Sequence, residues 1–146
     1  MITVRRRFHI AVPLDDLVTY LEDFEHTEEW DPGTVRCVRV DEGPVRPGST
    51  WRNTSRFRGR TSELVYRLEV RDPAHLVFVG TNKTVTSTDD MLFEAVSPSE
   101  TSLMYQASLR FKGLARWATP FLRAEFERLA DEVAERLPSA VAERHP

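Results

Sequence analysis

The sequence predicts an α+β domain in which a seven-stranded antiparallel sheet wraps around a long C-terminal helix, with two short helices after the first strand. Three observations support this prediction. Most segments between residues 34 and 112 alternate apolar and polar residues, as half-buried strands do. Turn signals such as Gly43-Pro44 and Asp72-Pro73 join these segments by hairpin-length connections. A long stripe of large apolar residues then follows at helical spacing.

The first expected elements are a strand and two short helices. Residues 2–10 alternate in the strand manner, and Arg6 falls on the same face as the apolar residues. Pro13 can open a helix, where its missing N–H costs nothing, and apolar residues recur at helical spacing through about residue 24. A short helical turn is expected over residues 26–30, followed by Asp31-Pro32-Gly33.

Six more strands are expected between residues 34 and 112, joined as an antiparallel meander with one solvated face. Their inward residues include Trp51, Asn53, Ser55, Phe57, Leu64, Tyr66, Leu68, Leu76, Phe78, Met91, Phe93, Leu103, Tyr105, Ala107, Leu109 and Phe111. The outward face should carry Arg52, Arg56, Arg58 and Arg67. Strand parity places one residue of the Asp89-Asp90 pair inward, although we expect a bulge or turn there.

An amphipathic helix is expected from residue 114 to about residue 137. Its apolar stripe comprises Leu114, Trp117, Phe121, Leu122, Phe126, Leu129, Val133 and Leu137. Such a stripe should lie across the concave face of the twisted sheet. Pro138 should end the helix, so the single domain of residues 1–146 would have its core at about 2–137 and a frayed tail at 138–146.

Composition narrows the class of protein. The 146 residues are 40 % hydrophobic and carry a net charge of −3, which is typical of one globular domain and gives no reason to expect a polyanion partner. No apolar run approaches the roughly 20 residues of a membrane-spanning helix, and no signal peptide is apparent. A single cysteine, Cys37, excludes an intramolecular disulfide and favours a cytoplasmic location.

The order of elements and several motifs resemble the START-like (SRPBCC) superfamily, in its polyketide cyclase/dehydrase and lipid-transport branch. Trp30-Asp31-Pro32-Gly33 stands where this family has a Trp-x-Pro-Gly turn, and Pro47-Gly48-Ser49 precedes the third strand. The segment RDPAHLVFVG matches the family's Pro-x-x-Leu-Val-Phe strand, and SPSETSLMYQASL and the final helix complete the pattern. The resemblance covers about residues 2–137 and implies the helix-grip fold, with a cavity between sheet and helix.

Three functions are compatible with this resemblance. The protein can bind a hydrophobic small molecule, aromatic or polyketide-like, in the cavity. It can instead be a cofactor-free aromatase/cyclase that promotes aldol condensation and dehydration, which requires shape and one or two acid/base groups. It can also be a protein-interaction or assembly module, which a filled cavity and an exposed apolar patch would favour. The sequence does not decide whether the protein is an enzyme.

Inward polar and aromatic residues are the candidates for the site. The expected ligand-binding residues are Trp51, Asn53, Ser55, Phe57, Tyr66, Phe93, Tyr105, Phe121, Glu125 and Phe126. Tyr66 and Tyr105 can also act as general acids, or they can be core tyrosines whose hydroxyls reach the rim or a backbone carbonyl. Asn53 and Ser55 can contact a ligand or water, or make purely structural hydrogen bonds, and Glu125 can reach the pocket or be solvated beside Arg128. Arg6 is a third catalytic candidate because it can bind a carboxylate or enolate, or it can pair with a carboxylate near the sheet edge.

The sequence lacks the motifs that metal, phosphate or nucleic-acid binding would require. His26 and Glu29 have the i, i+3 spacing of two metal ligands, but no further ligand pattern accompanies them, and no glycine-rich phosphate loop is present. We therefore expect neither a metal nor another cofactor. The outward arginines are interrupted by Glu63 and Glu69 and are not interleaved with aromatic residues, so a solvated face is favoured over a nucleic-acid interface. Nothing in the sequence indicates an oligomeric state.

Overall fold

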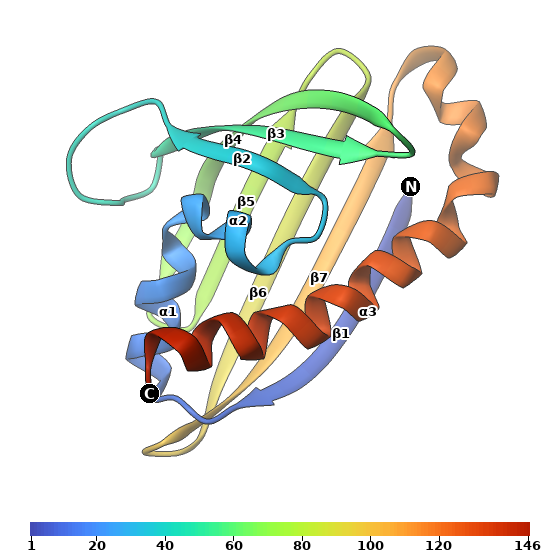
Figure 1. Cartoon of the computed structure of the whole chain (residues 1–146). Helices are drawn as coiled ribbons and strands as arrows, with labels where there is room; N and C mark the ends of the chain where they lie inside the picture. The colour runs from blue at the N-terminus through green and yellow to red at the C-terminus, as the bar shows by residue number, and fades with distance from the viewer.

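The computed structural model describes residues 1–146 and contains one antiparallel sheet in the order β1-β7-β6-β5-β4-β3-β2 (Figure 1). The strands are β1 (Ile2–Ile10), β2 (Thr34–Arg39), β3 (Thr50–Phe57), β4 (Arg60–Asp72), β5 (His75–Thr81), β6 (Val85–Ser97) and β7 (Glu100–Phe111). Strands β2 to β7 form the expected meander, and β1 pairs with β7 at the far edge. The predicted strand count and antiparallel topology are confirmed.

All the helices lie on one face of the sheet (Figure 1). The first group comprises α1 (Leu14–Glu22), the 3-10 turn η1 (Phe24–His26) and α2 (Thr27–Trp30). A second 3-10 segment, η2 (Gly113–Ala118), leads into the long helix α3 (Thr119–Arg144). Helix α3 crosses the sheet and approaches the α1–α2 group at its C-terminal end, which confirms the helix-grip arrangement.

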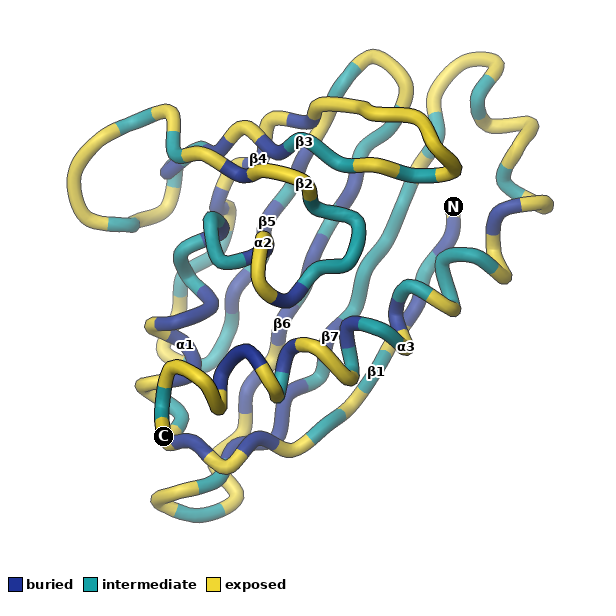
Figure 2. Tube along the Cα trace, viewed as in Figure 1, coloured by how far each residue is buried: buried dark blue, intermediate teal, exposed yellow.

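The main core lies where the α1–α2 group and the C-terminal half of α3 cover the sheet. It contains 23 buried residues, and Figure 2 shows buried positions gathered on the strands beneath these helices. Phe24 is at its centre, with ring centroids 4.4 Å from Phe78, 4.5 Å from Tyr66 and 6.1 Å from Trp51. Burial of such aromatic side chains is a major source of folding free energy.

Two predictions about the C-terminus are wrong. Helix α3 continues through Pro138 to Arg144, and the supposed tail includes the buried residues Ala140 and Val141. Proline removes one helical hydrogen bond, but packing of Leu137, Ala140 and Val141 in the main core offsets that loss. Arg144 also forms an ion pair with Glu29 of α2, which fixes the end of the helix.

The N-terminal end of the predicted long helix also differs from the prediction. Residues 113–118 form a 3-10 segment rather than an α-helix. Leu114, Trp117 and Phe121 are 87 %, 67 % and 77 % exposed, so the apolar stripe is not buried at this end. This part of the chain lies beside the sheet rather than over it, and the strands therefore cannot cover these side chains (Figures 1 and 2).

The outer face of the sheet carries ion pairs, as expected for a solvated face. Arg52 Nε lies 3.0 Å from Glu63 Oε1 across β3 and β4. Arg58 does not belong to this face, which corrects the prediction. Arg58 and Gly59 both have positive φ, 54° and 76°, in the two-residue β3–β4 turn. Strand parity does not apply to a turn of this kind, and Arg58 reaches Glu125 of α3 instead, with an Nη2–Oε1 distance of 2.9 Å.

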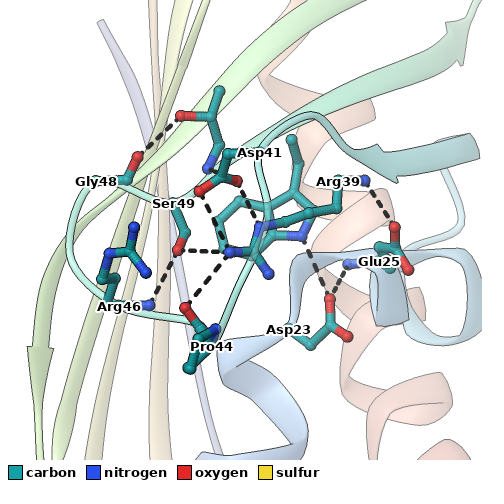
Figure 3. A network of polar contacts seen from close by, with 10 residues as sticks. Asp23, Glu25, Arg39, Asp41, Pro44, Arg46, Gly48 and Ser49 are labelled. Carbon is teal, nitrogen blue, oxygen red and sulfur yellow. Dashed lines mark hydrogen bonds and ion pairs between the residues drawn. The ribbon is translucent and has the colours of Figure 1, made fainter.

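A polar network anchors the long β2–β3 connection and η1 to the sheet edge (Figure 3). Arg39 Nε donates to Asp41 Oδ1 over 2.5 Å, and Asp41 also accepts from the Thr50 amide over 3.0 Å. These donors hold the pKa of Asp41 at about 2. The Arg39 amide donates to Glu25 over 2.6 Å, and the guanidinium lies over the Trp51 ring. The α1–α2 group is thus attached to β2 and β3 by polar contacts as well as by packing.

Candidate ligand-binding site

A cavity of about 220 Å³ lies between the sheet and α3, next to the main core. Its walls come from the hairpin ends of β3 and β4, the start of β6, the end of β7 and five residues of α3. The apolar walls include Val4, Phe57, Leu64, Val85, Ala107, Leu109, Phe111, Leu122, Phe126, Leu129, Ala130 and Val133. An apolar hollow of this kind is the usual form of a small-molecule site.

Small residues on facing elements create the space. Ala107 on β7 and Ala130 on α3 present only methyl groups, and Ser55, Ser62 and Ser87 contribute short side chains from the strands. The neighbouring inward positions toward the α1–α2 group carry Trp51, Phe78 and Met91, which are fully buried. The same sheet face is therefore filled at one end and hollow at the other.

Polar groups converge at the end of the cavity nearest the core. Tyr105 on β7 donates its hydroxyl hydrogen to Asp89 Oδ1 on β6 over 3.1 Å. Both residues line the cavity, and Asp89 is only 7 % exposed. The second oxygen, Oδ2, has no hydrogen-bond partner in the protein. No side-chain oxygen or nitrogen that lacks a partner is completely shielded from solvent in this structure. This oxygen therefore borders the open space of the cavity.

Burial is the main reason that the pKa of Asp89 rises from its ordinary value of 3.8 to about 7. The nearby charge of Asp31 raises it further, while the hydrogen bond from Tyr105 lowers it. Burial and the adjacent Asp89 also raise the pKa values of Tyr66 and Tyr105 well above 10. At neutral pH both phenols are protonated, and burial shifts the equilibrium of Asp89 toward its protonated form.

Asp31 is a second acidic residue at the cavity, but each of its two oxygens already accepts a hydrogen bond. Oδ1 accepts from the Gly33 amide over 3.1 Å, and Oδ2 accepts from the Thr34 hydroxyl over 2.8 Å. Burial raises the pKa of Asp31, and these two hydrogen bonds oppose that effect. Asp31 therefore stabilises the turn between α2 and β2 and contributes negative charge to the site.

The ring of Tyr66 lies on the backbone of Gly80 in the neighbouring strand. The two residues are directly paired between β4 and β5, and a Cβ at position 80 would lie 2.6 Å from atoms of the Tyr66 ring. Only glycine leaves room for the ring in this position. Ser87, also on the cavity wall, is a polar neighbour of the Tyr66 hydroxyl.

The mouth of the cavity is closed on one side by contacts between the β3–β4 hairpin and α3. Phe57 and Phe126 stack with a centroid distance of 4.9 Å and an interplanar angle of 7°. The ion pair between Arg58 and Glu125 lies directly beside this stack. Two residues of the hairpin thus contact two consecutive residues of the helix.

Half of the predicted ligand-binding residues line the cavity: Ser55, Phe57, Tyr66, Tyr105 and Phe126. Trp51, Asn53 and Phe93 do face inward, but the α1–α2 group and the main core cover Trp51 and Phe93. The Asn53 amide donates to Thr34 Oγ1 over 3.2 Å and accepts from Ser55 Oγ over 2.6 Å. These three residues therefore do not line this cavity, and the contacts of Asn53 are structural hydrogen bonds.

The remaining candidates also lie outside the cavity wall. Phe121 is exposed to solvent, and Glu125 binds Arg58 at the mouth. Arg6 does point toward α3, but Glu127 Oε2 and Asp131 Oδ1 bind its guanidinium at 2.7 and 2.9 Å. Arg6 is thus the edge ion pair that the sequence left open as an alternative.

Sequence reasoning missed Asp89 as a site residue. The alternation of β6 did place one residue of the Asp89-Asp90 pair inward, but we expected a bulge there. The pairing of β6 with β5 and β7 is regular at both positions, so parity holds. Asp89 points into the cavity, and Asp90 lies on the other face, where its Oδ1 is 2.9 Å from His75 Nε2. The unbroken strand period was the available signal.

The i, i+3 pair His26 and Glu29 has other partners. The His26 ring stacks on Tyr20, and Glu29 accepts from the Tyr20 hydroxyl over 2.9 Å and pairs with Arg144. No group of three or more His, Cys, Asp or Glu side chains is arranged to hold a metal ion.

None of the helices combines the length and hydropathy that crossing a bilayer requires.

Residues 1–142 match the family model described as polyketide cyclase / dehydrase and lipid transport. The chain belongs to this family. No curated protein is similar enough in sequence to match it.

Solved structures support the family's fold. The chain is similar to the Zhui aromatase/cyclase from Streptomyces sp. R1128, with a TM-score of 0.80, 16 % identity, and coverage of 99 % of this chain and 95 % of the other. The chain is also similar to a START superfamily protein from Mycobacterium smegmatis, with a TM-score of 0.72 and 16 % identity, and coverage of 97 % of this chain and 95 % of the other. Human STARD10 is similar with a TM-score of 0.72 and 16 % identity, and the match covers 97 % of this chain and 63 % of the other. At such low identities, these matches establish the fold of this family member.

Proposed function

We propose that this family member binds a hydrophobic, aromatic or polyketide-like small molecule in the cavity between the sheet and α3. The observation that carries the proposal is the unfilled apolar cavity with a polar end formed by Asp89, Tyr105 and Tyr66. An apolar cavity of about 150 Å³ can hold benzene. The volume of about 220 Å³ here is suited to a ligand of one or two aromatic rings.

Native mass spectrometry of protein purified from its own host tests this proposal directly. We expect a retained small molecule in the wild type and none in Ala130→Phe, because the new ring occupies the cavity from α3. Ala124→Phe is the matched control, since Ala124 is an exposed residue of the same helix. Equal ligand retention in both variants would place the ligand elsewhere and contradict the proposal.

A cofactor-free aromatase/cyclase is the second candidate function. The hydrogen-bonded Asp89–Tyr105 pair favours it, because both groups line the cavity and either can transfer a proton to or from a bound ketone. Aldol condensation and dehydration need such a proton donor and acceptor in a shaped, water-poor site. The open cavity favours these two functions over a protein-interaction module.

Turnover of a linear poly-β-ketone thioester, followed by absorbance of the aromatic product, distinguishes an enzyme from a carrier. For an enzyme, Tyr105→Phe should lower the rate by about 100-fold or more, since a general acid/base contributes at least that much. For a carrier, the same variant should only weaken binding, with the loss of a hydrogen bond of about 0.5–1.5 kcal/mol. If Tyr105→Phe changes stability but neither affinity nor turnover, the hydroxyl is structural.

A further inference from the structure

The polar end of the cavity is acidic and contains no cation. Asp89 and Asp31 are its two carboxyl residues, and Tyr66, Tyr105 and Ser87 supply its hydroxyl groups. The one basic residue on the cavity wall is Arg56, whose side chain is exposed. A ligand that reaches the inner end therefore meets hydroxyl and carboxyl groups only.

The basic residues nearest to this end are directed elsewhere. Arg6 is bound by Glu127 and Asp131 on α3. Arg136, which acts on Asp31 from α3, is exposed and does not line the cavity. The α3 residues that face the polar end are apolar, including Ala130 and Val133. A buried ligand carboxylate would thus have no counter-ion, and an unpaired buried charge is strongly unfavourable.

Asp89 has one oxygen available to a ligand. Tyr105 occupies Oδ1, and Oδ2 borders the cavity without a protein partner. A protonated carboxyl is a hydrogen-bond donor, whereas a carboxylate only accepts. Burial and the facing charge of Asp31 favour the protonated form of Asp89 up to neutral pH. The chemical group that complements this oxygen is then a neutral acceptor.

We propose that the cavity selects neutral aromatic ligands with a ketone or phenol oxygen over carboxylates of the same shape, and that Asp89 binds this oxygen through its free Oδ2. This inference rests on the proposed ligand-binding function and names its ligand class and its specificity-determining residue. It also predicts that fatty acids and aromatic acids are poor ligands. The groups that face Asp89 are Asp31, Tyr66 and Tyr105, and the phenols stay protonated when Asp89 ionises.

Matched naphthalene probes test the inference. Binding of 2-acetonaphthone, a neutral ketone, and of 2-naphthoate, a carboxylate, is measured by calorimetry at about pH 6 and about pH 8.5, on either side of the Asp89 pKa. The ketone should bind the wild type at least about tenfold more tightly than the carboxylate at pH 6, and its affinity should fall about tenfold at pH 8.5.

Asp89→Asn keeps a neutral donor at every pH. Ketone binding to this variant should therefore be independent of pH, and naphthoate should bind it more tightly than it binds the wild type at pH 8.5. Asp90→Asn is the matched control, because Asp90 is the adjacent residue on the other face of β6. It should reproduce the wild-type affinities and their pH dependence.

Two kinds of failure are distinguishable. If both probes bind and Ala130→Phe abolishes binding, but naphthoate binds as tightly as the ketone or the pH dependence persists in Asp89→Asn, the ligand-class inference is overturned and the cavity remains a binding site. If neither probe binds the wild type, or Ala130→Phe binds both as well as the wild type does, the binding function itself fails and the inference fails with it.

Discussion

Trp51 and Phe57 occupy the same face of β3, yet they belong to different parts of the molecule. Trp51 is fully buried beneath η1, where its Nε1 donates to Asp23 over 3.3 Å. Phe57, six residues further along the strand, stacks on Phe126 at the mouth of the cavity. At this end α3 covers the sheet, and its residues at the cavity include the small Ala130. The comparison shows that strand parity decides which side chains face inward, while the covering helices decide whether they meet a packed core or a cavity.

The largest effect should come from truncating the packed end. Phe24→Ala should lower the free energy of unfolding by about 3–5 kcal/mol, because Phe24 is 2 % exposed and its ring packs near four other aromatic rings. Phe126→Ala at the hollow end should cost only about 1–2 kcal/mol, since its ring is half-buried. Urea denaturation measures both, and equal losses would show that the two ends do not differ in packing.

The next effect concerns the charge at the hollow end. Between about pH 4 and pH 7, folded Asp89 keeps a proton that the unfolded chain has released, so stability falls as the pH rises. Above this range the wild type has an ionised, buried carboxylate. At pH 8 the free energy of unfolding of Asp89→Asn should therefore exceed that of the wild type by at most about 4 kcal/mol. Urea denaturation measures this difference.

That advantage of Asp89→Asn should be nearly absent at pH 4, where folded Asp89 is protonated and about half of the unfolded chains carry this proton as well. Asp90→Asn, measured in parallel, should show no such pH-dependent gain. A gain for Asp89→Asn that is the same at pH 4 and pH 8 would mean that the buried carboxyl is not the cause.

A smaller loss of stability should follow from substituting Gly80, which lies against Tyr66 between the packed end of the sheet face and the cavity. In Gly80→Ala the new methyl would meet the Tyr66 ring at 2.6 Å, so the ring must move. We expect a loss of about 1–3 kcal/mol in stability, as for other overpacked sites. Gly80→Ala/Tyr66→Leu should recover part of this loss because the flat ring is gone. No recovery in the double variant would place the strain elsewhere.

The smallest effect should come from Phe121, which the sequence pattern assigned to the cavity wall. Its ring is 77 % exposed, so Phe121→Ala should change the free energy of unfolding by less than about 0.5 kcal/mol. Affinity for 2-acetonaphthone should also stay the same, measured beside Phe126→Ala as the cavity-lining counterpart. A loss as large as that of Phe126→Ala would show that this segment packs over the cavity in solution.

Local sequence was sufficient to predict the fold of this protein. Alternation with period two, punctuated by turn residues, predicts the seven strands and their inward faces, and the stripe at helical spacing predicts α3. These signals are reliable because each depends on neighbours along the chain. The same parity placed Ser55, Tyr66 and Tyr105 in the cavity wall and would have placed Asp89 there too.

The tertiary structure alone decided what lies over each inward residue. The α1–α2 group covers Trp51 and Asn53, and nothing in their own strand predicts this contact. Packing of Ala140 and Val141 extends α3 past Pro138, although proline is a local stop signal. The positive φ of Arg58 sends its side chain to Glu125. In the first two cases contacts between residues distant in sequence contribute more free energy than the local preference, so the local pattern could not reveal them. Arg58 departs from strand parity because its two-residue turn has a backbone conformation of its own.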